Sequence, residues 1–320
     1  MLVSSLSVVL SSSCKKSDGE SGGARSVEVL IDWQAEPTYV GVYYAKTSGL
    51  FSDEGYDVTI VESWGANRAS AAVASGRYKV GTASGGASVL AVDKGAPIVS
   101  TAVINRKIST VIYGLATTKL DEPTDLYGKT VGMYAGSINV NEFEAFIHAN
   151  GLDRAKITQT VISGNDLAPL KAGSIDVALN YRELSPTRLS LDQTAPEVAG
   201  KRMNYMMLNQ HGVDGYGLNV ISSRAALRES PKLVNAVTKA IVSGYKNGCA
   251  NQGEAVAQFM ELFPQKDREY IAKGWAVTCE QLEPLDGIGR QDQAGWSSTI
   301  AMFEKEGLLK SEPASADMMP

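Results

Sequence analysis

Residues 27–32 read VEVLID, a short apolar stretch with a charged end that predicts a β-strand. The same kind of signal returns at residues 56–61 (YDVTIV), 78–83 (YKVGTA) and 97–103 (PIVSTAV). Helical segments lie between these strands, and one of them, residues 68–75, is rich in small residues and stops at a glycine. Strands that alternate with helices predict a mainly parallel sheet covered by helices on both faces.

A second set of such units follows from residue 126, and four long helical segments close the chain. The predicted helices of this last part are Pro231 to Gly244, Gln252 to Phe263, Asp267 to Val277 and Asp292 to Glu306. We therefore predict an α/β protein of two lobes. Residues 27–113 and 215–320 form the first lobe, and residues 114–214 form the second, inserted lobe. Two crossings at similar places make a hinge, with a cleft between the lobes at the carboxyl ends of the strands.

Chain length and charge indicate which kinds of partner to expect. The chain has 320 residues, enough for two cores, and a formal net charge of -5. It has no basic run of the kind that nucleic-acid binders carry, so we expect no nucleic-acid partner.

The N-terminus resembles an export signal. Residues 1–14 form a short apolar stretch that ends in small residues and Cys14, similar to the lipobox of bacterial lipoproteins. It is too short to span a membrane as a helix. Residues 15–26 are polar and rich in glycine and serine, which is typical of a flexible tether. The alternative is a disordered tail with an incidental cysteine.

The remaining cysteines, Cys249 and Cys279, fit no metal-binding motif. They could form a disulfide in an oxidising compartment or remain two buried thiols. The chain has only two histidines, too few for a zinc site or a histidine-based triad, so we predict neither metal nor cofactor.

Seven segments in order along the chain resemble the thiamine-pyrimidine, taurine and nitrate group of ABC-transporter substrate-binding proteins. They are Asp32 to Pro37 (DWQAEP), Gly41 to Ala45 (GVYYA), Gly49 to Val58 (GLFSDEGYDV), Ala74 to Gly81 (ASGRYKVG), Leu126 to Gly132 (LYGKTVG), Leu170 to Ala178 (LKAGSIDVA) and Phe303 to Leu309 (FEKEGLL). The resemblance implies a periplasmic-binding-protein fold of the type II kind, a small-molecule ligand and a membrane permease as partner. It also implies a monomer that works in the periplasm or on the outer face of the cytoplasmic membrane.

The Asp-Trp pair after the first strand resembles the branch of this group that binds pyrimidine precursors of thiamine, or riboflavin. That branch also contains fungal pyrimidine synthases with the same fold, which carry a histidine two residues after the proline and a cysteine cluster further on. Here Tyr39 takes the histidine's position, and residues 216–223 hold no cysteine. We therefore predict a binding protein and not an enzyme.

In the first lobe, aromatic residues and two glycine turns are candidate ligand contacts. Trp33 and Tyr39, with either Tyr43 or Tyr44, could stack on a planar heterocycle, although some of them could instead pack in the core. Two strand-to-helix turns could offer backbone N–H groups to an anion or an amide, or be tight turns and nothing more. Their candidate residues are Trp64, Gly65, Asn67, Ser84 and Gly85.

In the second lobe, Gly136 and Ser137 at a helix start repeat this arrangement. The end of a later strand supplies Asn180, Tyr181 and Glu183, at a place where the resemblance implies an aromatic and a carboxylate. Arg182 lies between the last two and would favour an anion, or it could form a surface ion pair with Glu183, so the sign of the ligand stays open. His211, near the second hinge, is predicted to be structural, and His148 is predicted to be exposed on a helix.

Overall fold

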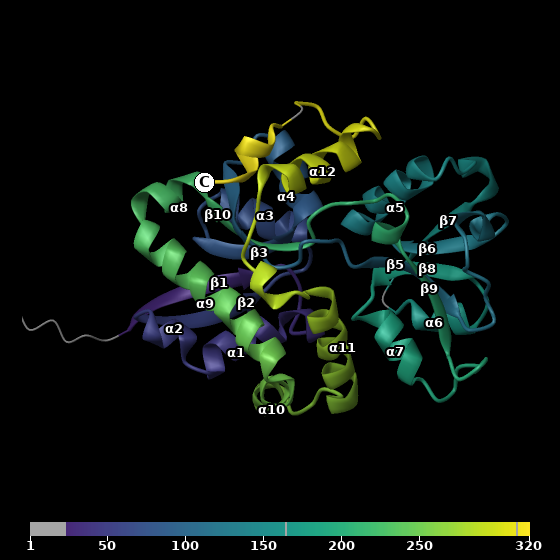
Figure 1. Ribbon diagram of the computed structural model, residues 1–320, viewed down its shortest axis with the longest axis horizontal. Coiled ribbons are helices and arrows are strands. Elements are labelled where there is room, and N and C mark those ends of the chain that lie inside the picture. Colours follow the sequence, from purple (N-terminus) through teal and green to yellow (C-terminus); the bar gives the residue numbers. More distant parts are fainter. Residues whose placement is uncertain (1–23, 164, 312) are drawn as a thin grey trace, which may run out of the picture.

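The computed structural model describes residues 24–163, 165–311 and 313–320. Two lobes lie side by side, each a five-stranded sheet with helices on both of its faces (Figure 1). The second lobe, teal in Figure 1, is made from one continuous stretch of chain. The first lobe contains the beginning and the end of the described chain. The predicted two-lobed α/β architecture is confirmed.

The sheet of the first lobe has the strand order β2-β1-β3-β10-β4. Its strands are β1 (Arg25–Ile31), β2 (Tyr56–Glu62), β3 (Val80–Ser84), β4 (Ile98–Val103) and β10 (Leu218–Ser223). Strand β1 pairs in parallel with β2 and β3, whereas β10 runs antiparallel to both β3 and β4. The helices of this lobe are α1 (Val40–Thr47), α2 (Leu50–Asp53), α3 (Ala66–Ala74), α4 (Gly85–Asp93), α8 (Arg224–Glu229), α9 (Pro231–Ala250), α10 (Gln252–Leu262), α11 (Arg268–Gln281) and α12 (Gln293–Glu304).

The sheet of the second lobe has the order β7-β6-β8-β5-β9 and repeats this plan. Its strands are β5 (Thr110–Leu115), β6 (Thr130–Tyr134), β7 (Thr158–Ile162), β8 (Val177–Tyr181) and β9 (Met203–Met207). Strand β5 is antiparallel to both of its neighbours, β8 and β9. The helices are α5 (Ile138–Ala149), α6 (Leu167–Lys171) and α7 (Ser185–Leu191). Each sheet is therefore mixed, with one reversed strand, and not parallel throughout.

Two of the sequence boundaries need correction. The predicted lobe boundary between residues 113 and 114 falls inside β5, all of which belongs to the second sheet, so the first crossing precedes Thr110. Strand β1 begins at Arg25, inside the segment predicted as a tether. The predicted export signal, Cys14 and the rest of the tether before residue 24 lie outside the described residues.

Local chemistry explains where the helices facing the other lobe begin. The hydroxyl of Ser84 accepts a hydrogen bond from the Ala87 N–H at 3.2 Å, and that of Ser137 accepts one from the Asn139 N–H at 3.4 Å. Both serines satisfy backbone donors that the first turn of a helix leaves free. Helices α4 and α5 thus begin at the carboxyl ends of β3 and β6.

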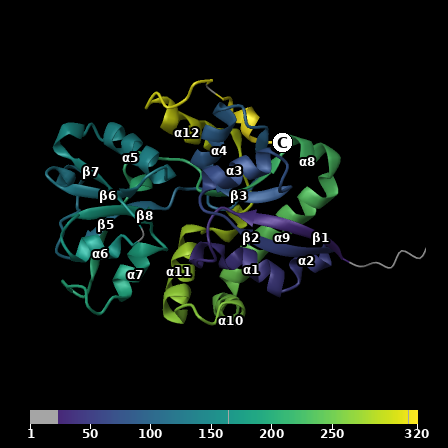
Figure 2. The same ribbon diagram turned by 180° about the vertical axis from the view of Figure 1, so that it is seen from behind.

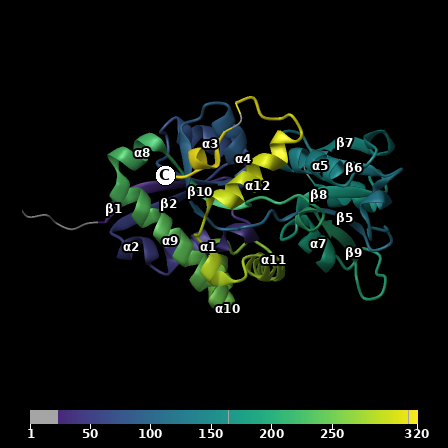
Figure 3. The same cartoon turned by 45° about the horizontal axis from the view of Figure 1, so that its top comes forward.

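Helix α12 lies along the junction of the two lobes (Figure 3). Its Trp296 and Phe303 belong to the same hydrophobic cluster as Phe143 and Phe146 of α5, so apolar packing continues from one lobe into the other. On the opposite side α11 of the first lobe packs beside α7 of the second, as the view from behind in Figure 2 also shows.

Cys249 of α9 and Cys279 of α11 form a disulfide with a Cα–Cα distance of 5.4 Å, which settles the alternative that the sequence left open. Both cysteines are buried. Within the described residues no helix combines the length and the apolar character needed to span a membrane.

Candidate ligand-binding site between the lobes

The carboxyl ends of the parallel strands of the two sheets face each other across the junction. The Thr38 hydroxyl, beyond β1, donates a hydrogen bond to Glu183, beyond β8, at 3.0 Å. The side-chain amide of Asn67, beyond β2, donates to the carbonyl oxygen of Gly136, beyond β6, at 3.4 Å. In open α/β sheets ligands bind outside the carboxyl ends of the strands, so this junction is the candidate site.

Asp32 is the first residue after β1 and is 8% exposed. Its carboxylate accepts hydrogen bonds from the hydroxyls of Thr82 and of Tyr39, the latter at 2.9 Å. Burial nevertheless raises the pKa of Asp32 above its usual range, because two neutral donors do not replace water around a charge. Asp32 forms no ion pair with any described residue.

Glu142 of α5 supplies a second buried carboxylate from the other lobe. It is 1% exposed, and the Thr110 hydroxyl at the start of β5 donates to it at 2.5 Å. Burial raises the pKa of Glu142 from 4.5 to about 7. Tyr181 lies near Glu142, Asp32 and Glu183, whose negative charges add to burial in raising the pKa of its phenol. Carboxylates from both lobes therefore act on the Tyr181 phenol.

Glu183 joins the lobes. One of its carboxylate oxygens accepts from the Thr38 hydroxyl, and the other accepts from the Gln281 amide at 3.2 Å, and both donors belong to the first lobe. Burial raises the pKa of Glu183. The sequence predicted a ligand contact here, and the structure places Glu183 in the lobe junction itself.

Ion pairs surround Glu183 on the same edge of the junction. Arg182 makes a bidentate pair with Glu280 of α11, with both N–O distances 3.1 Å. The guanidinium of Arg188 lies 3.5 Å from the ring centre of Tyr270 and also pairs with Glu36 at 3.4 Å. We call this set of contacts, which joins α7 and its preceding loop to α11 and Glu36 of the first lobe, the lobe latch. Arg182 therefore pairs with Glu280, not with the neighbouring Glu183.

Of the predicted aromatic contacts, the two tryptophans remain accessible. Trp33 is 39% exposed and Trp64 is 61% exposed, and their rings meet edge to face with centres 6.0 Å apart. The ring of Tyr39 is only 4% exposed and its hydroxyl holds Asp32, so its stacking role stays a prediction. Tyr43 and Tyr44 both belong to the core of the first lobe.

The backbone N–H groups of Gly65 and Gly85 already have acceptors. The Gly65 N–H donates to the carbonyl oxygen of Asp32 at 2.9 Å, and the Gly85 N–H donates to that of Gly217 at 2.7 Å. The predicted anion-binding use of these two groups is therefore not supported. Gly85 is needed for close packing, because a β-carbon there would lie 2.3 Å from the carbonyl oxygen of Tyr216.

Asn180 is also engaged within its own lobe. Its amide nitrogen donates to Asp166 at 2.7 Å and to Ser185 at 2.9 Å, and its amide oxygen accepts from the Tyr181 N–H at 2.8 Å. The prediction that Asn180 contacts a ligand has no support from these hydrogen bonds and stays a prediction. His211 contacts Phe146 edge to face within the second lobe, as a structural residue would.

His148 is exposed, as predicted, and its ring pairs with Glu306 at 3.2 Å. Gly136 and Ser137 lie at the junction, where the Gly136 carbonyl oxygen contacts Asn67 and Ser137 caps α5.

Sequence reasoning missed Asp32 as a site residue and missed Glu142 altogether. A signal for Glu142 was present, because it lies four residues after Ile138 and four before Phe146, on the apolar face of α5. A single acidic residue in such a stripe is a candidate for a buried functional group. No cluster of three or more described histidine, cysteine, aspartate or glutamate residues could hold a metal ion.

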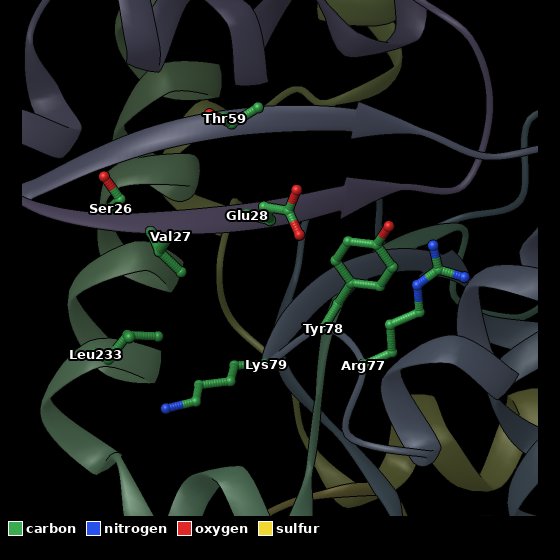
Figure 4. Close-up of a pocket in the computed structure, with 8 residues that line it drawn as sticks. All are labelled: Ser26, Val27, Glu28, Thr59, Arg77, Tyr78, Lys79 and Leu233. Atoms are coloured by element: carbon green, nitrogen blue, oxygen red, sulfur yellow. The ribbon is translucent and has the colours of Figure 1, made fainter.

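A separate hollow of about 330 Å³ lies on the first lobe at the other end of β1 from Asp32 (Figure 4). Glu28, Tyr78 and Lys79 are among the residues that line it. None of the residues that line it was predicted as a ligand contact, and it is distinct from the lobe junction.

Solved structures share this fold. The alkanesulfonate-binding protein SsuA from Xanthomonas axonopodis pv. citri, bound to MOPS, superposes with a TM-score of 0.70 at 16% identity, covering 93% of this chain and 99% of that one. The periplasmic aliphatic sulphonate binding protein SsuA from Escherichia coli gives a TM-score of 0.72 at 14% identity, covering 92% and 97%. The fold is therefore that of the two-lobed periplasmic binding proteins.

The NMT1/THI5-like family profile matches residues 36–255, and the chain belongs to that family. It is similar to a formylaminopyrimidine-binding protein from Halalkalibacterium halodurans, with 24% identity over 98% of this chain and 95% of that protein. It is also similar to a 4-amino-5-hydroxymethyl-2-methylpyrimidine phosphate synthase from Saccharomyces cerevisiae, with 21% identity over 77% of this chain and 74% of the synthase. The resemblance stated from the sequence is confirmed.

Proposed function

We propose that this chain is the solute-binding component of an ABC importer and that its lobes close on a small heteroaromatic ligand that carries an amino group. The observation that carries the choice of ligand is the set of buried carboxylates at the junction. Asp32, Glu142 and Glu183 are all under 9% exposed, and none of them pairs with a described lysine, arginine or histidine.

These carboxylates favour a ligand that donates hydrogen bonds or carries positive charge. An anionic ligand placed about 4 Å from one ionised carboxylate would meet a repulsion of about 4 kcal/mol at the effective dielectric constant of a protein. Arg182, the cation that could have reversed this preference, is held by Glu280. A sulfonate or nitrate is therefore disfavoured, and an aminopyrimidine of the thiamine-precursor kind fits the acceptors.

The two lobes would contribute different contacts. Asp32 offers an acceptor from the first lobe and Glu142 one from the second, while the accessible ring of Trp33 provides a stacking surface. A ligand that bridges both lobes stabilises the closed arrangement by its higher affinity for it. The lobe latch adds contacts that form only when the lobes meet, and the closed form would dock on a membrane permease.

We propose binding without catalysis. Tyr39 stands where the resemblance implies a histidine in the synthases, and it serves the fold, because its hydroxyl donates to Asp32 and its ring is buried. Cys249 and Cys279 are joined to each other, so neither is a free thiolate nucleophile. Position 39 and residues 216–223 thus lack the histidine and the cysteines that the resemblance implies for the synthases.

The disulfide supports a location outside the cytoplasm, since such bonds persist in oxidising compartments. We place the protein in the periplasm or on the outer face of the cytoplasmic membrane, as a monomer. Lipid anchoring through Cys14 is part of this proposal, and mass spectrometry of the membrane-associated protein would test it.

The function is tested by the thermal stability of the purified protein with a panel of hydroxymethylpyrimidine, formylaminopyrimidine, riboflavin, taurine and nitrate. A ligand present at about 100 times its dissociation constant adds about 2.7 kcal/mol of stability. We expect a raised midpoint with an aminopyrimidine and no effect of taurine or nitrate. A midpoint raised only by the anions would overturn the choice of ligand, and product formed from a pyrimidine precursor would overturn the absence of catalysis.

A further inference from the structure

Asn139 is a buried amide without a hydrogen-bond partner in the part of the chain that the structure describes. It is the second residue of α5 and is 6% exposed, and its side-chain oxygen is buried with no donor among the described residues. Its amide nitrogen also makes no hydrogen bond to a described residue. Unpaired buried polar groups are rare because their burial costs free energy.

The other buried asparagine of the interior shows the usual arrangement. Asn219 of β10 is fully buried, and its amide donates to the Ala83 carbonyl oxygen at 2.8 Å and to the Ser88 hydroxyl at 3.3 Å. Asn139 departs from this pattern although polar neighbours are close in sequence. Its amide is therefore available to a group that is not part of the chain.

The position of Asn139 points to the junction of the lobes. Helix α5 starts at the carboxyl end of β6, and Ile138 lies against the first lobe, where a β-carbon on Gly86 would come within 3.1 Å of it. Glu142 follows Asn139 by three residues and so lies on the same side of the helix, one turn further from the junction. The unpaired amide and the buried carboxylate thus form one polar strip on the second lobe.

We propose that Asn139 is a specificity-determining residue that reads the edge of the ligand. An amide presents a donor and an acceptor side by side, which complements a heterocycle with an amino group next to a ring nitrogen, as asparagine does with adenine. This inference rests on the proposed function, and it identifies the residue that recognises the amino-bearing edge of the ligand. Asp32 and Glu142, as carboxylates, cannot donate a hydrogen bond to a ring nitrogen unless they are protonated.

The test replaces the amide by an apolar group of similar shape, Asn139→Leu, with Asn141→Leu on the same helix as the matched control. Calorimetry would measure the affinity of the wild type and both variants for 4-amino-5-hydroxymethyl-2-methylpyrimidine and for the same compound without its amino group. Denaturation would measure the stability of each ligand-free protein.

We expect Asn139→Leu to lose about ten- to hundredfold in affinity for the amino compound, and much less for the compound without the amino group. The ligand-free variant should be at least as stable as the wild type, because an unpaired buried amide has been removed. Asn141→Leu should leave both affinities unchanged.

Unchanged affinity in Asn139→Leu, or an equal loss of affinity for both compounds, would overturn the inference and leave the proposed function standing. A ligand-free Asn139→Leu protein that is clearly less stable would also overturn it, because the amide would then serve the fold. If the wild type binds neither pyrimidine, the proposed ligand class fails, and the reading of its amino edge fails with it.

Discussion

Replacing Glu142 by glutamine isolates the free-energy cost of the buried charge at the lobe junction. The amide has the same shape and can still accept the hydrogen bond that the Thr110 hydroxyl donates at 2.5 Å. It cannot ionise, however. The variant should therefore be more stable than the wild type wherever the wild-type carboxyl is forced to be charged, and the advantage should depend on pH.

The size of the effect follows from the raised pKa of Glu142, from 4.5 to about 7. The folded state binds the proton more tightly than the unfolded state, so this group's contribution to wild-type stability falls as pH rises between these two values. Linkage gives an advantage of Glu142→Gln of about 1 kcal/mol near pH 5 and about 3 kcal/mol near pH 8. Any constant difference between the two hydrogen bonds to Thr110 adds equally at both pH values.

The assay is urea denaturation of the ligand-free wild type and variant at both pH values. Glu144→Gln is the matched control, because Glu144 lies on the same helix but is partly exposed and pairs with Arg154. We expect the Glu142→Gln advantage to grow by about 2 kcal/mol from the lower to the higher pH, and the control to show no such growth. An advantage that does not change with pH would refute the view that Glu142 is buried without a cation.

Three further predictions concern the latch, the stacking surface and the disulfide. Arg182→Glu should break the pair with Glu280 and weaken ligand binding by up to about fivefold, since a partly exposed pair contributes about 1 kcal/mol or less, and adding Glu280→Arg should restore the affinity measured by calorimetry. Trp33→Ala should weaken binding of an aromatic ligand by about tenfold without lowering the thermal midpoint of the ligand-free protein, and a lowered midpoint would instead assign the ring to the core. Replacing Cys249 and Cys279 by serine opens a loop with a sequence separation of 30 and should cost about 3 to 4 kcal/mol in urea denaturation, whereas a cost near zero would mean that the pair is not bonded in solution.

The sequence predicted the strands and helices of the first lobe well, because turn residues separate them. Gly49 adopts a φ of 81° between α1 and α2, a conformation that glycine adopts without strain. The sequence-based prediction failed at β5. The apolar run Thr110–Leu115 follows the strand signal of β4, and few turn-forming residues separate the two. Short apolar runs carry no information on which sheet they join, so the lobe boundary was placed too late.

For the site, the sequence located the strand ends but not the direction of the side chains. Trp33 and Tyr39 were equivalent candidates, and only the packing of Tyr39 under Asp32 separates them. Glu183 was recognised as important from the resemblance, whereas its partners Thr38 and Gln281 lie 145 and 98 residues away in sequence. Contacts between distant segments of this kind depend on how the two lobes meet, which no local pattern specifies.

The place of β10 in the first sheet also determines when along the chain that sheet can be completed. Among the described strands of that sheet, β4 has β10 as its only neighbour, and β10 is separated from it in sequence by the whole second lobe. The second lobe is continuous, and its first strand pairs with its last, Val111 opposite Met207, so it can close as soon as residue 207 is available. During synthesis or export from the N-terminus, the sheet of the first lobe would stay incomplete until β10 is available to pair between β3 and β4. A chaperone that protects exposed strand edges would therefore be needed longest by the lobe that begins first.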